Sequence, residues 1–288
     1  MTTNNIRGIG WMLLQCLVFS LLSVVTHYLS QTLPVAVMYS LSMMVALTMM
    51  LPSVLHNTNA TLRTSGLKFY LLRTVSGAAS MLVWFYALKL APVTEVTAIS
   101  FTTPLFTSLF AVLILKEKMG IGRGIVLIIG FIGAIIMLNP GMVPDMQTGA
   151  LLALLTALLW SICDVTIKHQ LRSDGYNTQI FYMSLLMSLI TLPLALLQWQ
   201  MPTVEQGALI IVLGLLFWLN FHCLFRAYDY ADLTVVMPFD FSRVIYSSIL
   251  ATWLFGEHLD KWMISGSLII VASTVMLACY ERNKHSTN

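Results

Sequence analysis

The sequence predicts an all-α polytopic membrane protein whose ten transmembrane helices form two inverted five-helix repeats. Three observations lead to this prediction: the composition, the spacing of apolar stretches and a long-range repeat. Of the 288 residues, 58% are hydrophobic and 9% are charged, whereas soluble domains carry roughly 25% charged residues. A soluble chain of this size could not hide so much apolar surface from water, so lipid is the expected solvent.

Ten stretches of the chain are long and apolar enough to cross a bilayer, which requires about 20 such residues. Turn-forming or charged clusters separate the stretches, as at Asn139-Pro140-Gly141 and Phe255-Gly256-Glu257. No small-residue cleavage site follows the first stretch, so it is expected to remain as a helix. The predicted spans are 9–28, 35–55, 66–88, 92–114, 121–139, 148–168, 178–200, 206–228, 233–255 and 261–281.

The basic residues predict that both ends of the chain are cytoplasmic, because Lys and Arg concentrate in cytoplasmic segments of membrane proteins. With the N-terminus inside, ten basic residues fall in inner segments, and only Lys89 and Lys261 fall in outer ones. The ten inner residues are Arg7, Arg63, Lys68, Lys116, Lys118, Arg123, Lys168, Arg172, Arg282 and Lys284.

A shift of 140 residues superposes one half of the sequence on the other and brings Glu117 onto Glu257. The same shift brings Phe101 onto Phe241 without any gap. Internal similarity of this kind indicates a structural repeat. Because each half has an odd number of spans, the second half must enter the membrane in the opposite sense. The predicted halves are 1–143 and 144–288, and this plan is common in secondary transporters.

The motifs of the first half resemble those of the EamA family of the drug/metabolite transporter superfamily. The motifs are Tyr86-Ala87-Leu88, Leu90-Ala91, Thr94-Glu95-Val96, Pro104-Leu105-Phe106 and Leu115-Lys116-Glu117, with an echo at Arg226-Ala227-Tyr228, Pro238 and Phe255-Gly256-Glu257. The stretch 238–243 is similar to bacterial carriers of S-adenosylmethionine or riboflavin. The resemblance implies alternating access around a central cavity, in a bacterial inner membrane. It covers nearly the whole chain and says little about the substrate.

Asp240 and Arg243 are the first candidates for substrate binding, since they lie three residues apart and share a face of the ninth span. A charge at the centre of a bilayer costs about 3 kcal/mol, so such residues must find partners or water. Arg243 offers a planar set of donors that suits a carboxylate or a phosphate. An ion pair that only locks the helices together is the alternative.

Two prolines are expected to break the helices that carry these groups. Pro238 and Pro104 lie in equivalent spans of the two halves, and each removes a backbone hydrogen bond to the residue four positions earlier. These earlier residues are Thr234 and Ser100. Freed carbonyls in paired broken helices indicate a binding site, although a simple kink would use the same residues.

Asp164 and Trp160 lie four residues apart in the sixth span and are predicted to share a face. The carboxylate is expected to exchange a proton or to meet a cationic substrate, with the indole ring beside it. Pairing of Asp164 with Lys168 is the alternative. Asn220 is a further candidate in the eighth span.

Aromatic candidates for the lining of the cavity are Trp84, Tyr86, Phe101, Trp160, Tyr182 and Phe241. Other polar residues have simpler interpretations. Arg73 is expected to extend toward the cytoplasmic headgroups, with Arg226 placed similarly. Glu117 and Glu257 are expected to cap neighbouring helices or to pair with Lys118 and Lys261.

The sequence carries no phosphate-binding loop, no zinc-protease or serine-hydrolase motif and no Cys/His cluster. No catalytic residue, cofactor, metal or nucleic-acid partner is therefore expected, and transport should depend on gradients. The predicted function is a secondary transporter of a small metabolite, best an amino-acid-bearing or nucleoside-like solute such as S-adenosylmethionine. Riboflavin uptake, amino-acid or drug export, and a receptor or scaffold remain alternatives. Coupling to protons and exchange for a counter-substrate are both compatible with the sequence. A monomer and a homodimer are both compatible with it as well.

Overall fold

The computed structural model describes residues 4–286 except 57–63, 65, 91–95, 97–98, 139–146 and 256–260. Within these residues the chain is helical and contains no strand. Its helices are α1 (Asn5–Ser30), α2 (Val35–Thr48), α3 (Leu51–His56), α5 (Leu67–Leu90), α7 (Thr103–Leu115), α8 (Ile121–Leu138), α9 (Gln147–Gln170), α10 (Tyr176–Leu197), α11 (Val204–Tyr230), α12 (Leu233–Asp240), α13 (Ser242–Phe255) and α14 (Lys261–Ser286).

Each predicted span contains a described helix, but three spans are not single helices. The second divides into α2 and α3, and the ninth divides into α12 and α13. In the fourth, a turn at Phe101 and Thr102 precedes α7. Breaks near Pro104 and Pro238 were expected, whereas the break at Met49 and Met50 in the second span was not. A proline lies within three residues of each break, at Pro52, Pro104 and Pro238, which explains the breaks in part.

Four of the described helices are long and apolar enough to cross a membrane. They are Asn5–Ser30, Thr148–Gln170, Tyr176–Leu197 and Val204–Tyr230. Four shorter apolar helices lie at Val35–Thr48, Thr103–Leu115, Ile121–Ile136 and Ile264–Ala278. Many Leu, Ile and Val side chains on the outer surface are more than a third exposed, as expected where the surrounding solvent is lipid.

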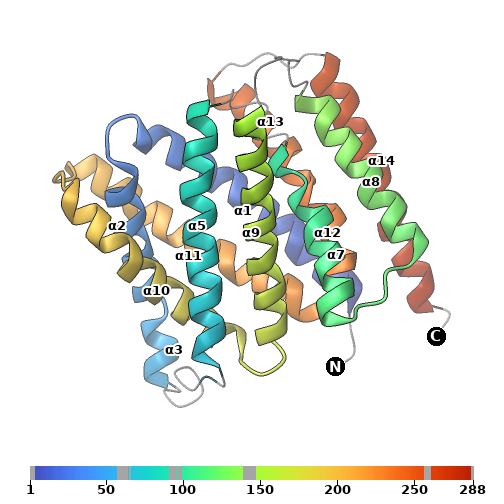
Figure 1. The fold of residues 1–288 in the computed structure, drawn as a ribbon, viewed down its shortest axis with the longest axis horizontal. Helices are drawn as coiled ribbons and strands as arrows, with labels where there is room; N and C mark the ends of the chain where they lie inside the picture. Colours follow the sequence, from blue (N-terminus) through green and yellow to red (C-terminus); the bar gives the residue numbers. More distant parts are fainter. Residues whose placement is uncertain are drawn as a thin grey trace.

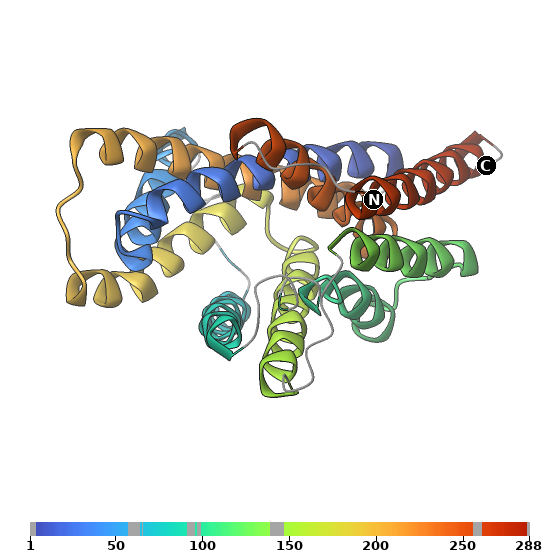
Figure 2. The same cartoon turned by 90° about the horizontal axis from the view of Figure 1, so that it is seen from above.

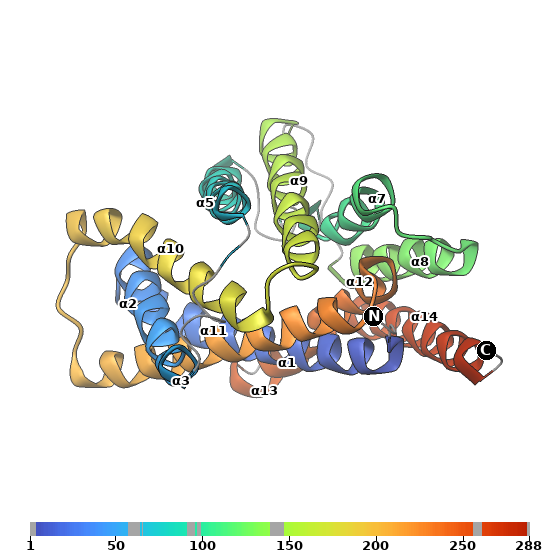
Figure 3. The ribbon, with the colours of Figure 1, turned by 90° about the horizontal axis from the view of Figure 1, so that it is seen from below.

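The most extensive helix contacts join elements from opposite halves of the sequence. They pair α5 with α9, α1 with α11, α8 with α14, and α2 with α10. Figure 1 shows α5 beside α9 and α8 beside α14. In Figures 2 and 3, α1, α11 and α14 run along one side of the molecule, whereas α5, α7 and α9 lie on the other.

Small residues allow the closest helix contacts, as is usual in membrane bundles. A Cβ added to Gly8 would lie 2.4 Å from the Cβ of Ala231, and one added to Gly133 would lie 3.2 Å from the carbonyl oxygen of Gly266. The first contact seats α1 against the end of α11, and the second seats α8 against α14. A larger side chain at either glycine would push these pairs apart.

Candidate functional site

The break in the ninth span places two charged residues inside the protein. Every residue of α12 is buried, and the helix ends at Asp240. Phe241 separates it from α13, which begins at Ser242, so Asp240 and Arg243 lie on either side of the break. Arg243 Nη2 lies 2.8 Å from Asp240 Oδ2, and the two side chains are 20% and 11% exposed. The predicted proximity of these two residues is confirmed.

Aromatic rings surround the guanidinium of Arg243. Its Cζ lies 5.0 Å from the ring centre of Phe101 and 5.5 Å from that of Phe19. The rings of Phe101 and Phe241 lie 6.2 Å apart. A cation over an aromatic face gains about 0.5–2 kcal/mol, with the higher value where water is excluded. Since Phe101 and Phe241 are equivalent in the sequence repeat, the two helix breaks meet beside Arg243.

The first helix holds the backbone of this break through small polar side chains. Ser20 Oγ donates to the carbonyl oxygen of Arg243 at 3.2 Å and lies 3.1 Å from Ser247 Oγ. The thiol of Cys16 lies 3.6 Å from the carbonyl oxygen of Phe239. Cys16 thus supplies a partner for a carbonyl in the last turn of α12, where regular helical bonding stops, and Ser20 links α1 to the first turn of α13.

Pro104 was predicted to leave the carbonyl of Ser100 free, and the structure differs from this prediction. Pro104 lies in the first turn of α7, where its missing N–H interrupts little of the helix. Pro104 has no N–H group to donate to the carbonyl oxygen of Ser100. This oxygen instead accepts from the hydroxyl of Thr103 at 2.7 Å. This carbonyl therefore already has a partner inside the protein. Pro238 lies inside α12 and is buried with the rest of that helix.

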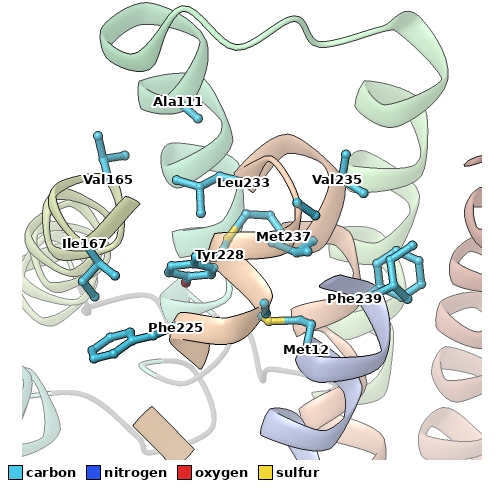
Figure 4. Packing of buried hydrophobic residues seen from close by; sticks show 14 of the residues in the cluster. Met12, Ala111, Val165, Ile167, Phe225, Tyr228, Leu233, Val235, Met237 and Phe239 are labelled. Atoms are coloured by element: carbon cyan, nitrogen blue, oxygen red, sulfur yellow. The ribbon is translucent and has the colours of Figure 1, made fainter. Parts of the chain in front are cut away.

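Asp164 forms a second buried acidic position close to the first. Its carboxylate accepts from the hydroxyl of Tyr228 at 3.0 Å and from that of Thr107 at 3.2 Å. It also interacts electrostatically with Asp240 and Arg243. Figure 4 shows the Tyr228 ring between α9 and α12. The three charged groups thus belong to one polar centre, which we define as Asp164, Tyr228, Asp240 and Arg243.

The alternative pairing of Asp164 with Lys168 is not found. The ammonium group of Lys168 instead donates to the carbonyl oxygens of Tyr228 and Ala231, the latter at 2.7 Å. These carbonyls lie at the end of α11, where backbone oxygens without a partner inside the helix attract a cation. Trp160 and Asp164 also differ in environment: the indole is 43% exposed whereas the carboxylate is buried.

The remaining candidates contact residues other than those of the polar centre. The ring of Trp84 packs on a small cluster that contains Ala87 and Ala153, and Tyr86 is exposed. Tyr182 lies 4.8 Å from Tyr70, measured between ring centres. Asn220 accepts from the side-chain amide of Gln15 at 3.0 Å. A role for these residues in binding stays a prediction.

Arg73 corrects one sequence prediction. Its side chain does not extend toward the membrane surface but is fully buried, with 0% exposure. Arg226 is half-buried over the ring of Tyr176, at 4.2 Å from its centre. Arg73, Phe19 and Tyr228 were not among the predicted site residues. The position of Arg73, two turns inside an apolar span, was a signal in the sequence. Phe19 and Tyr228 gave no such signal, because their role depends on which helix faces meet.

Glu117 caps the helix that carries the site. Its two carboxylate oxygens accept from the backbone N–H groups of Leu233 and Thr234, at 3.1 and 3.0 Å. These groups lie in the first turn of α12, so the predicted capping role of Glu117 is confirmed. Burial raises the pKa of the Glu117 carboxyl above its ordinary value. Glu257 lies outside the described residues.

Comparison with known proteins identifies the family. Residues 6–139 and 147–279 each match the EamA-like transporter family. The chain belongs to this family. EamA-like relatives include an S-adenosylmethionine uptake transporter of Rickettsia bellii, 30% identical over 279 residues that cover 97% of this chain and 96% of the relative. A riboflavin transporter of Vibrio cholerae is 30% identical over 287 residues, which cover 98% of this chain and 96% of the relative.

More distant proteins share the architecture. A pseudopaline exporter of Pseudomonas aeruginosa is 24% identical over 274 residues, with 94% of this chain and 95% of the exporter covered. A solved crystal structure matches with a TM-score of 0.80 and 17% identity, and covers 94% of this chain and 96% of the other. At that identity the structural likeness shows the fold. The chain is therefore a multi-pass membrane protein of the EamA-like family.

Proposed function

We propose that this protein is a secondary transporter that moves a small organic metabolite, best S-adenosylmethionine, across a bacterial inner membrane by alternating access. The observation that carries the proposal is the ion pair of Asp240 and Arg243 at the break of the ninth span. A transporter binds its substrate where discontinuous helices of the two halves meet. The contact between Phe101 and Phe241 supports such a meeting point.

An inverted repeat of two halves, 1–143 and 144–288, forms part of this proposal. If each helix is replaced by its equivalent in the other half, the set of main helix contacts stays the same. The pair α1 and α11 becomes α9 and α5, whereas α8 with α14 and α2 with α10 each map onto themselves. The two matches to the family, at residues 6–139 and 147–279, support the same division.

Cytoplasmic location of both termini is also proposed. The excess of basic residues in the predicted inner segments supports it. The start of α1 and the end of α14 lie on the same side of the molecule in Figure 1, as an even number of spans requires. This orientation places the loop between α9 and α10, which contains Asp174, on the cytoplasmic side.

The chemistry of the polar centre suits a zwitterion that carries an aromatic base. Arg243 has donors for a carboxylate, and its Nε has no partner among the described residues. Asp164 and Asp240 are suited to the ammonium and sulfonium groups of S-adenosylmethionine. Phe101 and Phe241 offer ring faces to adenine. Relatives named S-adenosylmethionine uptake transporters support this substrate.

Riboflavin is the second candidate, because a relative of equal identity is named a riboflavin transporter. Riboflavin has a large aromatic ring system and no carboxylate or ammonium group. It would therefore use the phenylalanines and leave the paired charges without a counterpart. This difference makes the two substrates separable by mutation of the ion pair.

Uptake by cells that express the protein tests the proposal. Labelled S-adenosylmethionine and labelled riboflavin are supplied in parallel to cells with the wild type, Arg243→Ala, Asp240→Ala or an empty vector. Lys68→Ala is the matched control, since it removes an exposed charge. We expect S-adenosylmethionine uptake by the wild type and the control only. Wild-type uptake equal to that of the vector would exclude this substrate, and uptake of riboflavin alone would select the second candidate.

Reconstitution separates transport from the receptor or scaffold alternative and identifies the coupling. Purified protein in proteoliposomes should move labelled substrate down its gradient. Stimulation by an imposed proton gradient indicates proton coupling, and stimulation by internal unlabelled metabolite indicates exchange. A ligand-induced rise in unfolding temperature without any flux would favour a receptor.

A further inference from the structure

Arg73 of α5 is the most deeply buried arginine of the described residues, with no exposed surface. Its Nη1 donates to Gln179 Oε1 at 2.8 Å, and its Nη2 donates to the backbone oxygen of Gln179 at 3.2 Å. The rings of Tyr70 and Phe225 flank the guanidinium, with their centres 5.3 and 5.4 Å from Cζ. All these partners are electrically neutral.

Within the part of the chain that the structure describes, no carboxylate pairs with Arg73. The groups that act on its charge are Tyr70 and Cys163. Its Nε is buried and has no hydrogen-bond partner. A buried charge without a counter-charge destabilises the folded protein, and a buried donor without an acceptor destabilises it further. The site therefore has the donors and the charge to receive an anion.

Arg73 lies where α5 packs against α9, the helix that also carries Asp164. Cys163 Sγ lies 3.3 Å from the backbone oxygen of Arg73, and Cys163 directly precedes Asp164. On the other side, the Tyr70 ring separates Arg73 from Asp174, whose carboxylate accepts from the Tyr70 hydroxyl at 3.0 Å. Arg73 thus lies in the part of α5 that packs against α9, between Cys163 and the loop between α9 and α10.

We propose that Arg73 is a second site for the carboxylate of the transported solute, placed where α5 packs against α9 and α10. The proposal rests on the proposed function. Arg243 is neutralised by Asp240 and holds the carboxylate only in part, whereas Arg73 has its full charge available. Gln179 Oε1 occupies the position of one carboxylate oxygen until the solute arrives. The solute then binds the free Nε and one Nη together, in the two-point geometry that guanidinium groups prefer.

A pair of substrates that differ only in the carboxylate tests this site without relying on a single variant. Initial uptake rates are measured for S-adenosylmethionine and decarboxylated S-adenosylmethionine, in wild type, Arg73→Met, Arg73→Lys and Arg226→Met. Arg226 is the matched control, because it also has a buried Nε without a partner and lies over an aromatic ring.

We expect Arg73→Met to lower uptake of S-adenosylmethionine about tenfold, which corresponds to about 1.4 kcal/mol, and to change uptake of the decarboxylated solute less than twofold. Arg73→Lys should restore part of the difference because it keeps the charge and loses the planar donors. Arg226→Met should leave both rates near those of the wild type. Equal loss for both solutes in Arg73→Met would show a structural role and overturn the site, as would no loss for either.

Failure of the proposed function has a different signature, because the wild type would then take up neither solute. The anion site is then judged on purified protein in detergent, with sodium formate replacing sodium chloride at constant ionic strength. Formate should raise the unfolding temperature of the wild type and of Arg226→Met more than that of Arg73→Met. An equal rise in all three proteins would overturn the site.

Discussion

Arg243 and Arg73 are both withdrawn from solvent, but the protein satisfies the two charges in different ways. Arg243 lies 2.8 Å from a carboxylate on its own span, next to a break in the helix. Arg73 lies in an unbroken helix and, among the residues that the structure describes, its side chain donates only to Gln179 of another helix. The first charge is balanced inside one segment, whereas the second depends on a neutral partner across an interface. Loss of a partner should therefore have a larger effect at Arg243 than at Arg73.

The largest effect is expected from Asp240→Asn. This substitution leaves Arg243 buried with no carboxylate of its own, and breaking a buried ion pair costs about 3–5 kcal/mol. Uptake and the unfolding temperature should both fall sharply. The double variant Asp240→Asn/Arg243→Met should recover stability but not uptake. Recovery of uptake as well would mean that the pair only holds the helices together.

Gln179→Leu is the corresponding change at Arg73. It removes the 2.8 Å hydrogen bond to Arg73 and the 3.3 Å hydrogen bond from Gln179 Nε2 to the backbone oxygen of Ile167, and it keeps the backbone oxygen of residue 179 as an acceptor. A hydrogen bond to a charged group contributes about 1.5–3 kcal/mol, so the loss of stability should be smaller than in Asp240→Asn. Thermal unfolding of both variants in the same detergent makes the comparison. A larger loss in Gln179→Leu would reverse the order of the two sites.

Glu117→Gln weakens the start of α12 without touching either arginine. The loss of a helix cap typically costs about 1 kcal/mol. Because the pKa of Glu117 is raised, the folded protein holds this proton more tightly than the unfolded chain does. The contribution of Glu117 to stability therefore falls as pH rises from the unfolded pKa through the folded one.

The pH dependence gives the measurement for this prediction. The stability difference between wild type and Glu117→Gln should shrink as pH rises through that window and then stay constant. The charges of Asp232 and Lys168 also shift the pKa of the Glu117 carboxyl. Asp232→Asn removes one of these charges and keeps Glu117, so it is a useful control. A difference that grows with pH would show that the hydrogen bonds to α12 outweigh burial.

Phe101→Leu removes one ring from Arg243 and keeps an apolar side chain of similar bulk. The cation–π contact contributes about 0.5–2 kcal/mol, so the apparent affinity for an aromatic substrate should fall several-fold with little change in stability. The KM of uptake measures this effect. Phe69→Leu, which changes a ring remote from Arg243 beside Lys68, should leave KM unchanged.

Trp160→Leu should have the smallest effect. The indole is 43% exposed, so leucine should leave uptake within about twofold of the wild type if the ring faces lipid, where apolar side chains are interchangeable. A larger loss in initial uptake rate would restore the prediction that Trp160 lines the passage beside Asp164.

Composition and the lengths of the apolar stretches were sufficient to predict that the described chain is helical. Lipid requires every backbone group to be satisfied within a helix, so apolar length predicts each helix and basic residues predict its orientation. The shared face of Asp240 and Arg243 followed from their spacing of three residues, and the capping role of Glu117 followed from its repeat-equivalent position. These features are local, or arise from similarity between two stretches of chain.

Contacts between distant segments were decided by the tertiary structure. Arg73 was expected to extend toward the headgroups, and Asp164 had Lys168 as an alternative partner, because sequence alone does not show which helix face meets which neighbour. Tyr228 and Thr107 give Asp164 its partners, and Gln179 gives Arg73 its own, across 106 residues of sequence. The environment of a buried charge depends on groups that only folding brings within hydrogen-bond distance, and the spacing of residues along one helix does not encode them.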